Sequence, residues 1–350
     1  VFATYAFVDR PPIPADLPRR EVLRHLLFHA RHGLPLMDVS YYSSQLVAAA
    51  RDLVAAHGID LVEVDHLQMA FVRRFLPEIP AILVNHNLES ELHPFWMTDR
   101  WSLPELVVWR AFAELSRRNA RAIELANRWG FSAKLFISPL DAAKVDDSCP
   151  KYHLPVPMAP EPRRAPFHRD RLDLLWVGGF DWPPNLEGMR WFLAEVWPRI
   201  LSRSEVPVRL RIVGGSPPDE LVAHAADDRI EVLGYVEDLA PLRATADVLV
   251  APLLSGSGVR VKTVEALAAG LPVVATPKGV EGLAVVPGRD LLVADTPDAF
   301  AAAVADLADP ERRVALSRAG TAYVAEHHDP ARVAEIKAEA IEAVLDRRCR

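Results

Sequence analysis

Residues 247–276, DVLVAPLLSGSGVRVKTVEALAAGLPVVAT, decide the fold class of this 350-residue chain. The stretch has the pattern of a buried strand, a glycine-containing loop, a helix and a second buried strand. A helix between two buried strands is typical of a parallel sheet. The same alternation precedes it at LDLLWVGGF (172–180), VRLRIVGG (208–215) and IEVLGYV (230–236). The sequence therefore predicts a doubly wound α/β domain over residues 171–325.

The N-terminal half shows the same alternation. Short β-branched runs at residues 59–66 and 80–87 flank a helical pattern over residues 67–78. Further helices are predicted over residues 41–57 and 103–128, with a strand at 130–138. We therefore expect a second Rossmann-like domain over residues 1–160.

The boundaries of the two halves have their own signals. Six prolines between residues 150 and 170 exclude a helix or a central strand there and indicate a linker. The chain begins without Met, as if a strand had just ended, so we expect the first domain to be incomplete at its start. The last helical stretch, residues 326–350, is expected to pack back on the N-terminal domain.

Composition excludes several classes of protein. The formal net charge of −7 argues against a general nucleic-acid binder. Cys149 and Cys349 cannot form a disulfide framework, and no apolar run reaches the roughly 18 to 20 residues of a membrane span. We expect a cytoplasmic protein. The basic stretch at residues 18–33 leaves two interpretations open, a solvated helix face or peripheral contact with the inner face of an anionic membrane.

The loop and helix at residues 256–265 have the residues of an anion site. Gly256 and Gly258 allow backbone conformations in which successive N–H groups converge, and the helix that follows adds its positive end. Arg260 and Lys262 add full charges, which favours a phosphate or diphosphate. Glu265 suits the hydroxyls of a ribose. The alternative is that these charges are solvated ion pairs on a helix face.

Three stretches together resemble a known family. They are LLWVGGFDWPPNLEGMRWFLAEVWPRI (174–200), GYVEDLAPLRATADVLVAPLL (234–254) and GSGVRVKTVEALAAGLPVVATPKGVEGL (256–283). They resemble the nucleotide-sugar-binding domain of retaining glycosyltransferases of family 4, over about residues 172–330. VEVDHLQMA (62–70) and VNHNLESE (84–91) are similar to the acceptor domain of the same group. The resemblance implies the GT-B fold, in which two Rossmann-like domains face a cleft.

The resemblance assigns roles to several donor-side residues. Glu265 matches the second glutamate of the family's E-x(7)-E motif, which binds the donor ribose, whereas Ser257 stands where the first glutamate contacts the sugar. Relatives carry an Arg and a Lys after the first strand of this domain, where this chain has Gly178 and Gly179. We therefore expect Arg260 and Lys262 to replace them from the other wall of the pocket.

The remaining donor-side candidates are less distinctive. Tyr235 and Val236 occupy the segment that lines the base pocket in relatives, largely through main-chain groups. Glu281 follows the last donor-side strand, where it either contacts the sugar or belongs to an ordinary turn.

The acceptor-side candidates follow two strands of the N-terminal half. His86, Asn87 and Glu89 come directly after residues 80–85, so they are expected at the carboxyl edge of the sheet. His86 either contacts the sugar and the acceptor hydroxyl or caps a loop. His66 occupies a similar edge. Phe95 and Trp96 form either an acceptor platform or part of the core.

These residues predict a glycosyltransferase that moves a sugar from a nucleoside-diphosphate sugar to a saccharide or lipid-linked acceptor, in polysaccharide or glycoconjugate synthesis. Retention of configuration is implied by the resemblance alone. No metal-binding motif is present, so we expect neither a metal nor another cofactor. Because Ser257 replaces an acid, a non-catalytic nucleotide-sugar-binding subunit remains an alternative. A GT-B-like epimerase would need acid/base pairs that the sequence does not reveal.

Overall fold

Two compact units make up the chain. The computed structural model describes residues 24, 27, 28, 30–33, 42–91, 103–145, 149–161, 165–256 and 258–348. The first unit comprises Val1–Leu154 and Ala334–Arg350, and the second comprises Pro155–Val333. Each unit contains its own parallel sheet, as expected from the repeated alternation of strands and helices.

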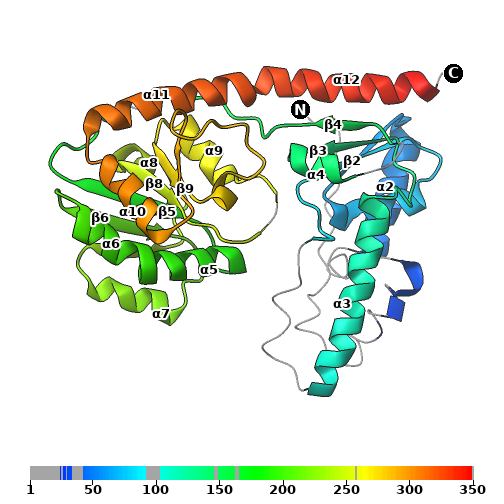
Figure 1. Ribbon diagram of the computed structural model, residues 1–350. Coiled ribbons are helices and arrows are strands. Elements are labelled where there is room, and N and C mark those ends of the chain that lie inside the picture. Colours follow the sequence, from blue (N-terminus) through cyan, green and yellow to red (C-terminus); the bar gives the residue numbers. More distant parts are fainter. Residues whose placement is uncertain are drawn as a thin grey trace. The chain divides into compact units, whose positions relative to one another are not determined.

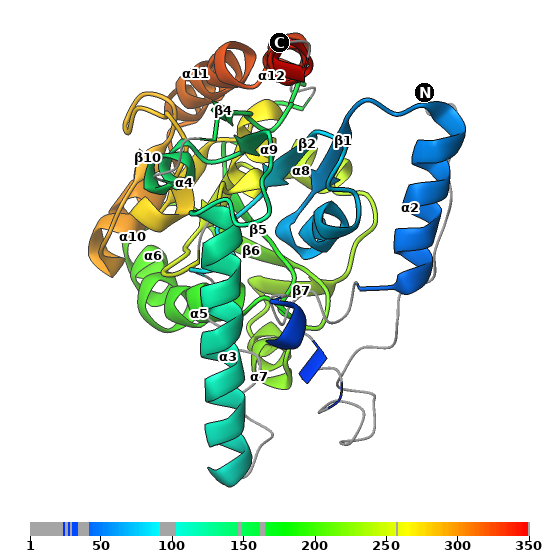
Figure 2. The same cartoon turned by 90° about the vertical axis from the view of Figure 1, so that its right-hand side faces the viewer.

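The sheet of the first unit has four parallel strands in the order β1-β2-β3-β4. Their bounds are β1 Val62–Asp65, β2 Ala81–Asn85, β3 Ala133–Phe136 and β4 Lys151–His153. Every residue of β2 and β3 is buried, which explains why these strands show apolar runs instead of alternation. The helices are α2 (Ser44–His57), α3 (Leu103–Glu124), which is one continuous helix (Figure 2), and α4 (Pro139–Lys144).

Two elements of the first unit differ from the sequence prediction. Residues Leu67–Phe75 form a 3₁₀ helix, although their apolar spacing resembles that of an α-helix. Lys151–His153 form a strand inside the stretch that we interpreted as a linker. This strand lies at the edge of the sheet, where the prolines around it remove no hydrogen bond from a central strand.

The second unit contains six parallel strands in the order β10-β9-β8-β5-β6-β7. They are β5 Leu172–Val177, β6 Val208–Val213, β7 Ile230–Gly234, β8 Val248–Ala251, β9 Val273–Ala275 and β10 Leu292–Val293. The chain leaves β5 toward one side of the sheet and returns to its other side at β8. Ligands of doubly wound proteins bind at such a switch point, outside the carboxyl ends of the strands.

Helices cover both faces of this sheet (Figure 1). Leu174 and Trp176 of β5 pack into one apolar cluster, and Leu175 packs into the cluster on the opposite face. This follows from the period of two along a strand. The helices of this unit are α5 Pro183–Trp191, α6 Trp197–Arg203, α7 Asp219–Val222, α8 Ala240–Thr245, α9 Val261–Ala268, α10 Pro297–Asp306 and α11 Pro310–His327. A further helix, α12 Pro330–Arg348, starts in this unit, and its residues from Ala334 onward belong to the first unit. Pro310 and Pro330 each begin a helix, so proline divides the helical C-terminal sequence.

A buried carboxylate ties the two central strands together at their amino ends. Asp247 precedes β8 and is fully buried. Its Oδ2 accepts the backbone N–H of Asp173 at 2.8 Å, and its Oδ1 lies 2.9 Å from Nη1 of Arg313, which is also fully buried. His168 donates its backbone N–H to Oδ1 and places Nδ1 2.8 Å from Oδ2. The carboxylate thereby connects β5, β8, α11 and the segment before β5.

In the part of the chain that the structure describes, no helix combines the length and apolar character needed to cross a bilayer.

The Asp247–Arg313 pair generates a stability prediction. Asp247→Asn removes the charge that balances buried Arg313, so the free energy of unfolding should fall by about 3–5 kcal/mol. Asp298→Asn is the matched control, because Asp298 pairs with Arg203 on the surface at 2.6 Å. This control should cost less than about 1 kcal/mol. Urea denaturation measures the free energy of unfolding of both variants. Equal losses in the two variants would contradict a larger contribution from the buried pair.

Candidate functional site

The site forms at the carboxyl ends of β5 and β8. Gly178 and Gly179 follow β5, and the loop containing Gly256 and Gly258 follows β8. Gly256 has φ of 102° and Gly258 has φ of 77°, so both adopt the left-handed conformations that the sequence predicts for this loop. Ser257 lies outside the described residues.

Lys262 reaches across this edge of the sheet. It lies on the first turn of α9, and its Nζ donates to Oδ1 of Asn185 on α5 at 2.8 Å. The same nitrogen lies 5.0 Å from the ring centre of Trp176 in β5. Burial, with the positive charge of Arg260 as the second cause, lowers the pKa of Lys262 from 10.5 to about 8. An anion at this point would restore the full charge of the amine.

The two glycines after β5 and β6 allow this close approach. A Cβ on Gly178 would lie 2.7 Å from Lys262 Nζ and 2.8 Å from Asn185 Nδ2. A Cβ on Gly214 would lie 1.9 Å from the carbonyl oxygen of Gly178. Asn185 also donates to the carbonyl of Gly179 at 2.8 Å. The sequence did not single out Asn185, although its position near the start of a helix after a glycine loop is a usable signal.

Arg260 is expected to contact a diphosphate, but its side chain is buried. Its side chain is only 7% exposed, and its Nε donates to the carbonyl oxygen of Lys278 at 2.9 Å. Its Nη2 is 3.7 Å from Oε2 of Glu281, a carboxylate that Lys278 Nζ also contacts at 2.8 Å. Arg260 therefore fastens the start of α9 to the turn after β9. Lys262 is the cation that reaches toward the β5 loop, a distinction that the sequence spacing did not reveal.

Buried threonines reinforce the same junction. Thr263 of α9 donates its hydroxyl to the carbonyl of Gly279 at 2.9 Å. Thr276 caps the 3₁₀ turn Pro277–Val280 by accepting the N–H of Gly279. A Cβ on Gly279 would lie 2.6 Å from the carbonyl oxygen of Ala251 at the end of β8. The turn that carries Glu281 is therefore packed tightly against β8 and α9.

Glu265 is paired with a residue that sequence analysis missed. Its Oε2 accepts from Nη2 of Arg243 on α8 at 2.6 Å. Tyr235 and Val236, which precede α8, differ in environment: Tyr235 is 78% exposed, whereas Val236 packs against the core cluster that contains Val264 and Leu267. Glu265, which is expected to bind ribose hydroxyls, and the segment expected beside a base are thus linked through α8.

The acceptor-side candidates gather at the carboxyl edge of the first unit's sheet. His86 follows β2, and its Nε2 lies 2.7 Å from Oδ1 of Asp65, the last residue of β1. The ring of His66 stacks on that of His86, with centroids 3.7 Å apart and planes inclined by 18°. Burial, followed by the neighbouring charge of His86, lowers the pKa of His66. Asp65 was not predicted, although it ends a strand next to His66.

Glu89, in the loop after β2, belongs to a buried polar network. Its Oε1 accepts from Gln68 Nε2 at 3.0 Å, and burial raises its pKa. The backbone N–H groups of Glu89 and Ser90 donate to the carboxylate of Glu124, whose pKa burial raises to about 7. Asn87 is half-buried in the same loop. Glu89 therefore holds the loop in place, whereas the histidines are the more exposed groups. Phe95 and Trp96 lie outside the described residues.

Two clusters among the described residues have the ligand types of a metal site. In the first, Asp65 joins His66 and His86, whose rings are stacked. In the second, His168 and Asp173 surround Asp247, whose oxygens are engaged by Arg313 and two backbone N–H groups.

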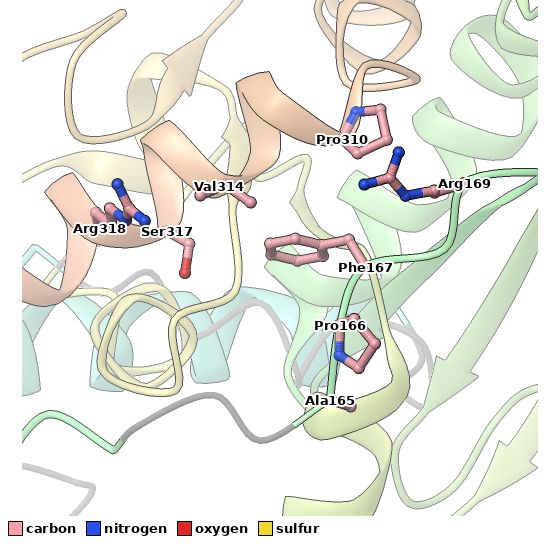
Figure 3. Close-up of a pocket in the computed structure, with 8 residues that line it drawn as sticks. All are labelled: Ala165, Pro166, Phe167, Arg169, Pro310, Val314, Ser317 and Arg318. Carbon is pink, nitrogen blue, oxygen red and sulfur yellow. The ribbon is translucent and has the colours of Figure 1, made fainter.

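A separate surface hollow of about 430 Å³ lies beside α11 (Figure 3). Figure 3 shows Phe167 and Arg169, from the segment before β5, and Val314 and Arg318 of α11 around it. This segment leads into the amino end of β5, whereas the glycine loops lie at the carboxyl ends of the strands. The hollow is therefore distinct from the predicted site, and no predicted residue lines it.

Comparison with known proteins shows what the second unit resembles. Residues 171–309 match the model of the family Glycosyl transferases group 1. This part of the second unit is therefore similar to a group 1 glycosyltransferase domain. It contains all the predicted donor-side residues, from Gly178 to Glu281.

Two curated relatives match parts of the chain. A phosphatidyl-myo-inositol mannosyltransferase of Mycolicibacterium smegmatis is 36% identical over 114 residues, which cover 31% of this chain and 28% of the relative. An uncharacterized 44.6 kDa protein in the cps region of Klebsiella pneumoniae is 29% identical over 163 residues, which cover 43% and 40%. The chain thus spans less than half the length of these relatives.

Solved structures support the fold class of the whole chain. Sucrose-phosphate synthase from Thermosynechococcus elongatus superposes with a TM-score of 0.64 at 19% identity, covering 94% of this chain and 80% of that one. HepE from Anabaena superposes with a TM-score of 0.60 at 16% identity, covering 85% and 82%. The predicted GT-B fold, with two Rossmann-like domains, is confirmed.

The contact between Gly178 and Lys262 in the second unit generates a prediction. In Gly178→Ala the new methyl group should push the amine out of its buried position beside Asn185, and because burial is the main cause of its low pKa, the pKa of Lys262 should rise from about 8 toward that of an ordinary lysine. Gly179→Ala is the control, because a Cβ there meets nothing within 4 Å. NMR titration of labelled lysine side chains measures the pKa. An unchanged value in Gly178→Ala would contradict the geometry.

Proposed function

We propose that the chain is a glycosyltransferase that moves a sugar from a nucleoside-diphosphate sugar to an acceptor hydroxyl. The observation that carries the proposal is the position of Lys262 Nζ, at the carboxyl end of β5 beside Gly178 and Asn185. A cation and a helix start at the switch point of a doubly wound sheet suit a diphosphate. The group 1 glycosyltransferase match of the same residues supports this assignment.

The chemistry requires stabilisation of a leaving diphosphate. When the bond between the anomeric carbon and the diphosphate oxygen breaks, negative charge accumulates on that oxygen. Lys262 would meet this charge directly, and the backbone N–H groups of the loop containing Gly256 and Gly258 would add to it. Arg260 would contribute through its charge and by fixing α9, since its guanidinium is held by Lys278 and Glu281. In this mechanism the transfer needs no metal ion.

The acceptor would be activated by the first unit. The imidazole of His86, oriented by Asp65 at 2.7 Å, can accept a proton from a hydroxyl or donate a hydrogen bond to a sugar. We propose a saccharide or a lipid-linked saccharide as the acceptor, and retention of the anomeric configuration. The location of one relative in a cps region, and the mannosyltransferase name of the other, favour a role in polysaccharide or glycoconjugate synthesis.

A uridine nucleotide is the first donor to test. Structures of HepE contain UDP, UDP with glucose, or UDP-glucose, and that of the pneumococcal O-GlcNAc transferase GtfA contains UDP and GlcNAc. These ligands belong to proteins of the same fold. UDP-glucose and UDP-GlcNAc therefore head the donor panel, followed by the GDP and ADP sugars.

A non-catalytic nucleotide-sugar-binding subunit is the second candidate. It is favoured by Ser257, which stands where relatives carry an acid, and by Glu281, whose carboxylate is already engaged by Lys278 and Arg260. The two candidates differ in turnover. Nucleotide-sugar binding without hydrolysis or transfer, over the donor panel and a set of saccharide acceptors, would favour the binding subunit.

Substitutions of Lys262 and Glu265 test the enzyme. Lys262→Met should lower kcat/KM by about 100-fold or more, because a charged hydrogen-bond donor to the leaving diphosphate is lost. Glu265→Ala should mainly raise KM, because its hydroxyl contacts are made equally in the ground state. Initial-rate kinetics with the best donor measures both. Kinetics like those of the wild type in both variants would overturn the site assignment.

The pKa of Lys262 generates a pH prediction. Without a ligand, the amine of Lys262 has a pKa of about 8. A bound diphosphate would raise this pKa, because it favours the charged form of the amine. The affinity for UDP should therefore be constant near pH 7 and fall as pH rises through 8, by up to about tenfold per unit. Lys262→Arg should bind UDP with a flat profile between pH 7 and 9.5, since arginine keeps its charge. Calorimetry at each pH measures the affinity for UDP. The same pH dependence in the wild type and in Lys262→Arg would contradict the role of the amine.

A further inference from the structure

An ion pair joins α8 to α9 within the second unit. Arg243 Nη2 donates to Glu265 Oε2 at 2.6 Å, and the two side chains are 20% and 32% exposed. Arg243 lies on the helix that follows the Tyr235–Val236 segment, and Glu265 lies on the helix that carries Lys262. The pair thus connects the segment expected beside the base with the wall expected beside the ribose and diphosphate.

The charge of Glu265 needs a partner in this position. Its carboxylate is close enough to Lys262 to raise the pKa of that amine, so it would also repel a diphosphate bound there. Arg243 balances this charge at close range. The carboxylate can then remain beside a dianionic ligand without opposing its binding.

The pair also fixes the direction of the carboxylate. The bond to Arg243 uses Oε2, so Oε1 is the oxygen available to accept from a ribose hydroxyl. A short charge-assisted bond to a planar guanidinium restricts the rotation of the glutamate side chain. A restricted acceptor discriminates between a hydroxyl and a hydrogen better than a mobile one, because less ordering is required when the ligand binds.

We propose that Arg243 is a positioning residue that sets the preference of the donor site for ribonucleotides by holding Glu265. The inference rests on the proposed function, because it concerns the nucleotide that the site binds. It goes beyond the assignment of Glu265 as the residue that binds the ribose. Arg243 contacts the carboxylate of Glu265 and acts on the ribose only through that carboxylate.

The test compares ribonucleotides with their deoxy counterparts. Dissociation constants for UDP, GDP and ADP and for the 2′-deoxy form of each are measured by calorimetry. The wild type should prefer the ribonucleotide by about tenfold or more, the usual effect of a hydrogen bond to a charged group. In Arg243→Met the preference should fall to about twofold or less. A structural role alone would weaken both nucleotides equally and leave their ratio unchanged.

A double-mutant cycle separates action through Glu265 from an independent effect. In a Glu265→Gln background, adding Arg243→Met should leave the ribo/deoxy ratio unaltered, because the carboxylate that Arg243 orients is absent. Arg203→Met, which breaks the surface pair with Asp298 of the same 2.6 Å length, should keep the full ratio of the wild type. Arg243→Lys retains the charge without the planar fork and should give an intermediate ratio.

The outcomes distinguish this inference from the proposed function. If the wild type binds none of the six nucleotides, the proposed function is overturned and the inference with it. If it binds them and Arg243→Met keeps the full ribo/deoxy preference, only the role of Arg243 is overturned. Thermal unfolding checks that each variant is folded. If Arg243→Met does not fold, Arg243→Lys decides, and a ratio equal to that of the wild type would overturn the inference.

Discussion

The carboxylate of Asp247 holds together the two strands on which the proposed donor site depends. It is buried at the amino end of β8, binds the backbone of β5 through the N–H of Asp173, and is balanced by Arg313 of α11. β5 and β8 are the strands that flank the switch point of the sheet. Because parallel strands share one direction, a constraint at their amino ends also fixes the separation of the two glycine loops at their carboxyl ends.

The loops at the other end are defined by close packing of the backbone. Gly214 lies against the carbonyl of Gly178, and Gly178 leaves room for the amine of Lys262 to reach Asn185. Gly279 in turn lies against the carbonyl of Ala251. A side chain at any of these positions would fill the space in which the cation or its supporting turn lies. The low pKa of Lys262 is a consequence of this packing, since burial is its main cause.

The sequence predicted the architecture well, because its signals are local. Apolar runs of four to six residues followed by glycine and then by a helical pattern specify strand, loop and helix in turn, and four such units imply a parallel sheet. The weaker predictions concern elements whose state depends on tertiary contacts. Leu67–Phe75 form a 3₁₀ helix although their apolar spacing resembles that of an α-helix, and Lys151–His153 form an edge strand next to β3 within a proline-rich stretch.

By itself, the sequence determined that Gly178, Gly256, Lys262 and Glu265 belong to the segments at one edge of a doubly wound sheet, because Gly178 follows one strand and the loop and helix with the other three follow another. Only the tertiary structure decided what each charge does there. Arg260 is two residues from Lys262, yet it points into the turn after β9 while Lys262 points toward α5. Glu265 pairs with Arg243, and His86 with Asp65, each about 20 residues away. The partners come from different strands and helices, and spacing along the chain does not encode which side chains meet when the layers pack.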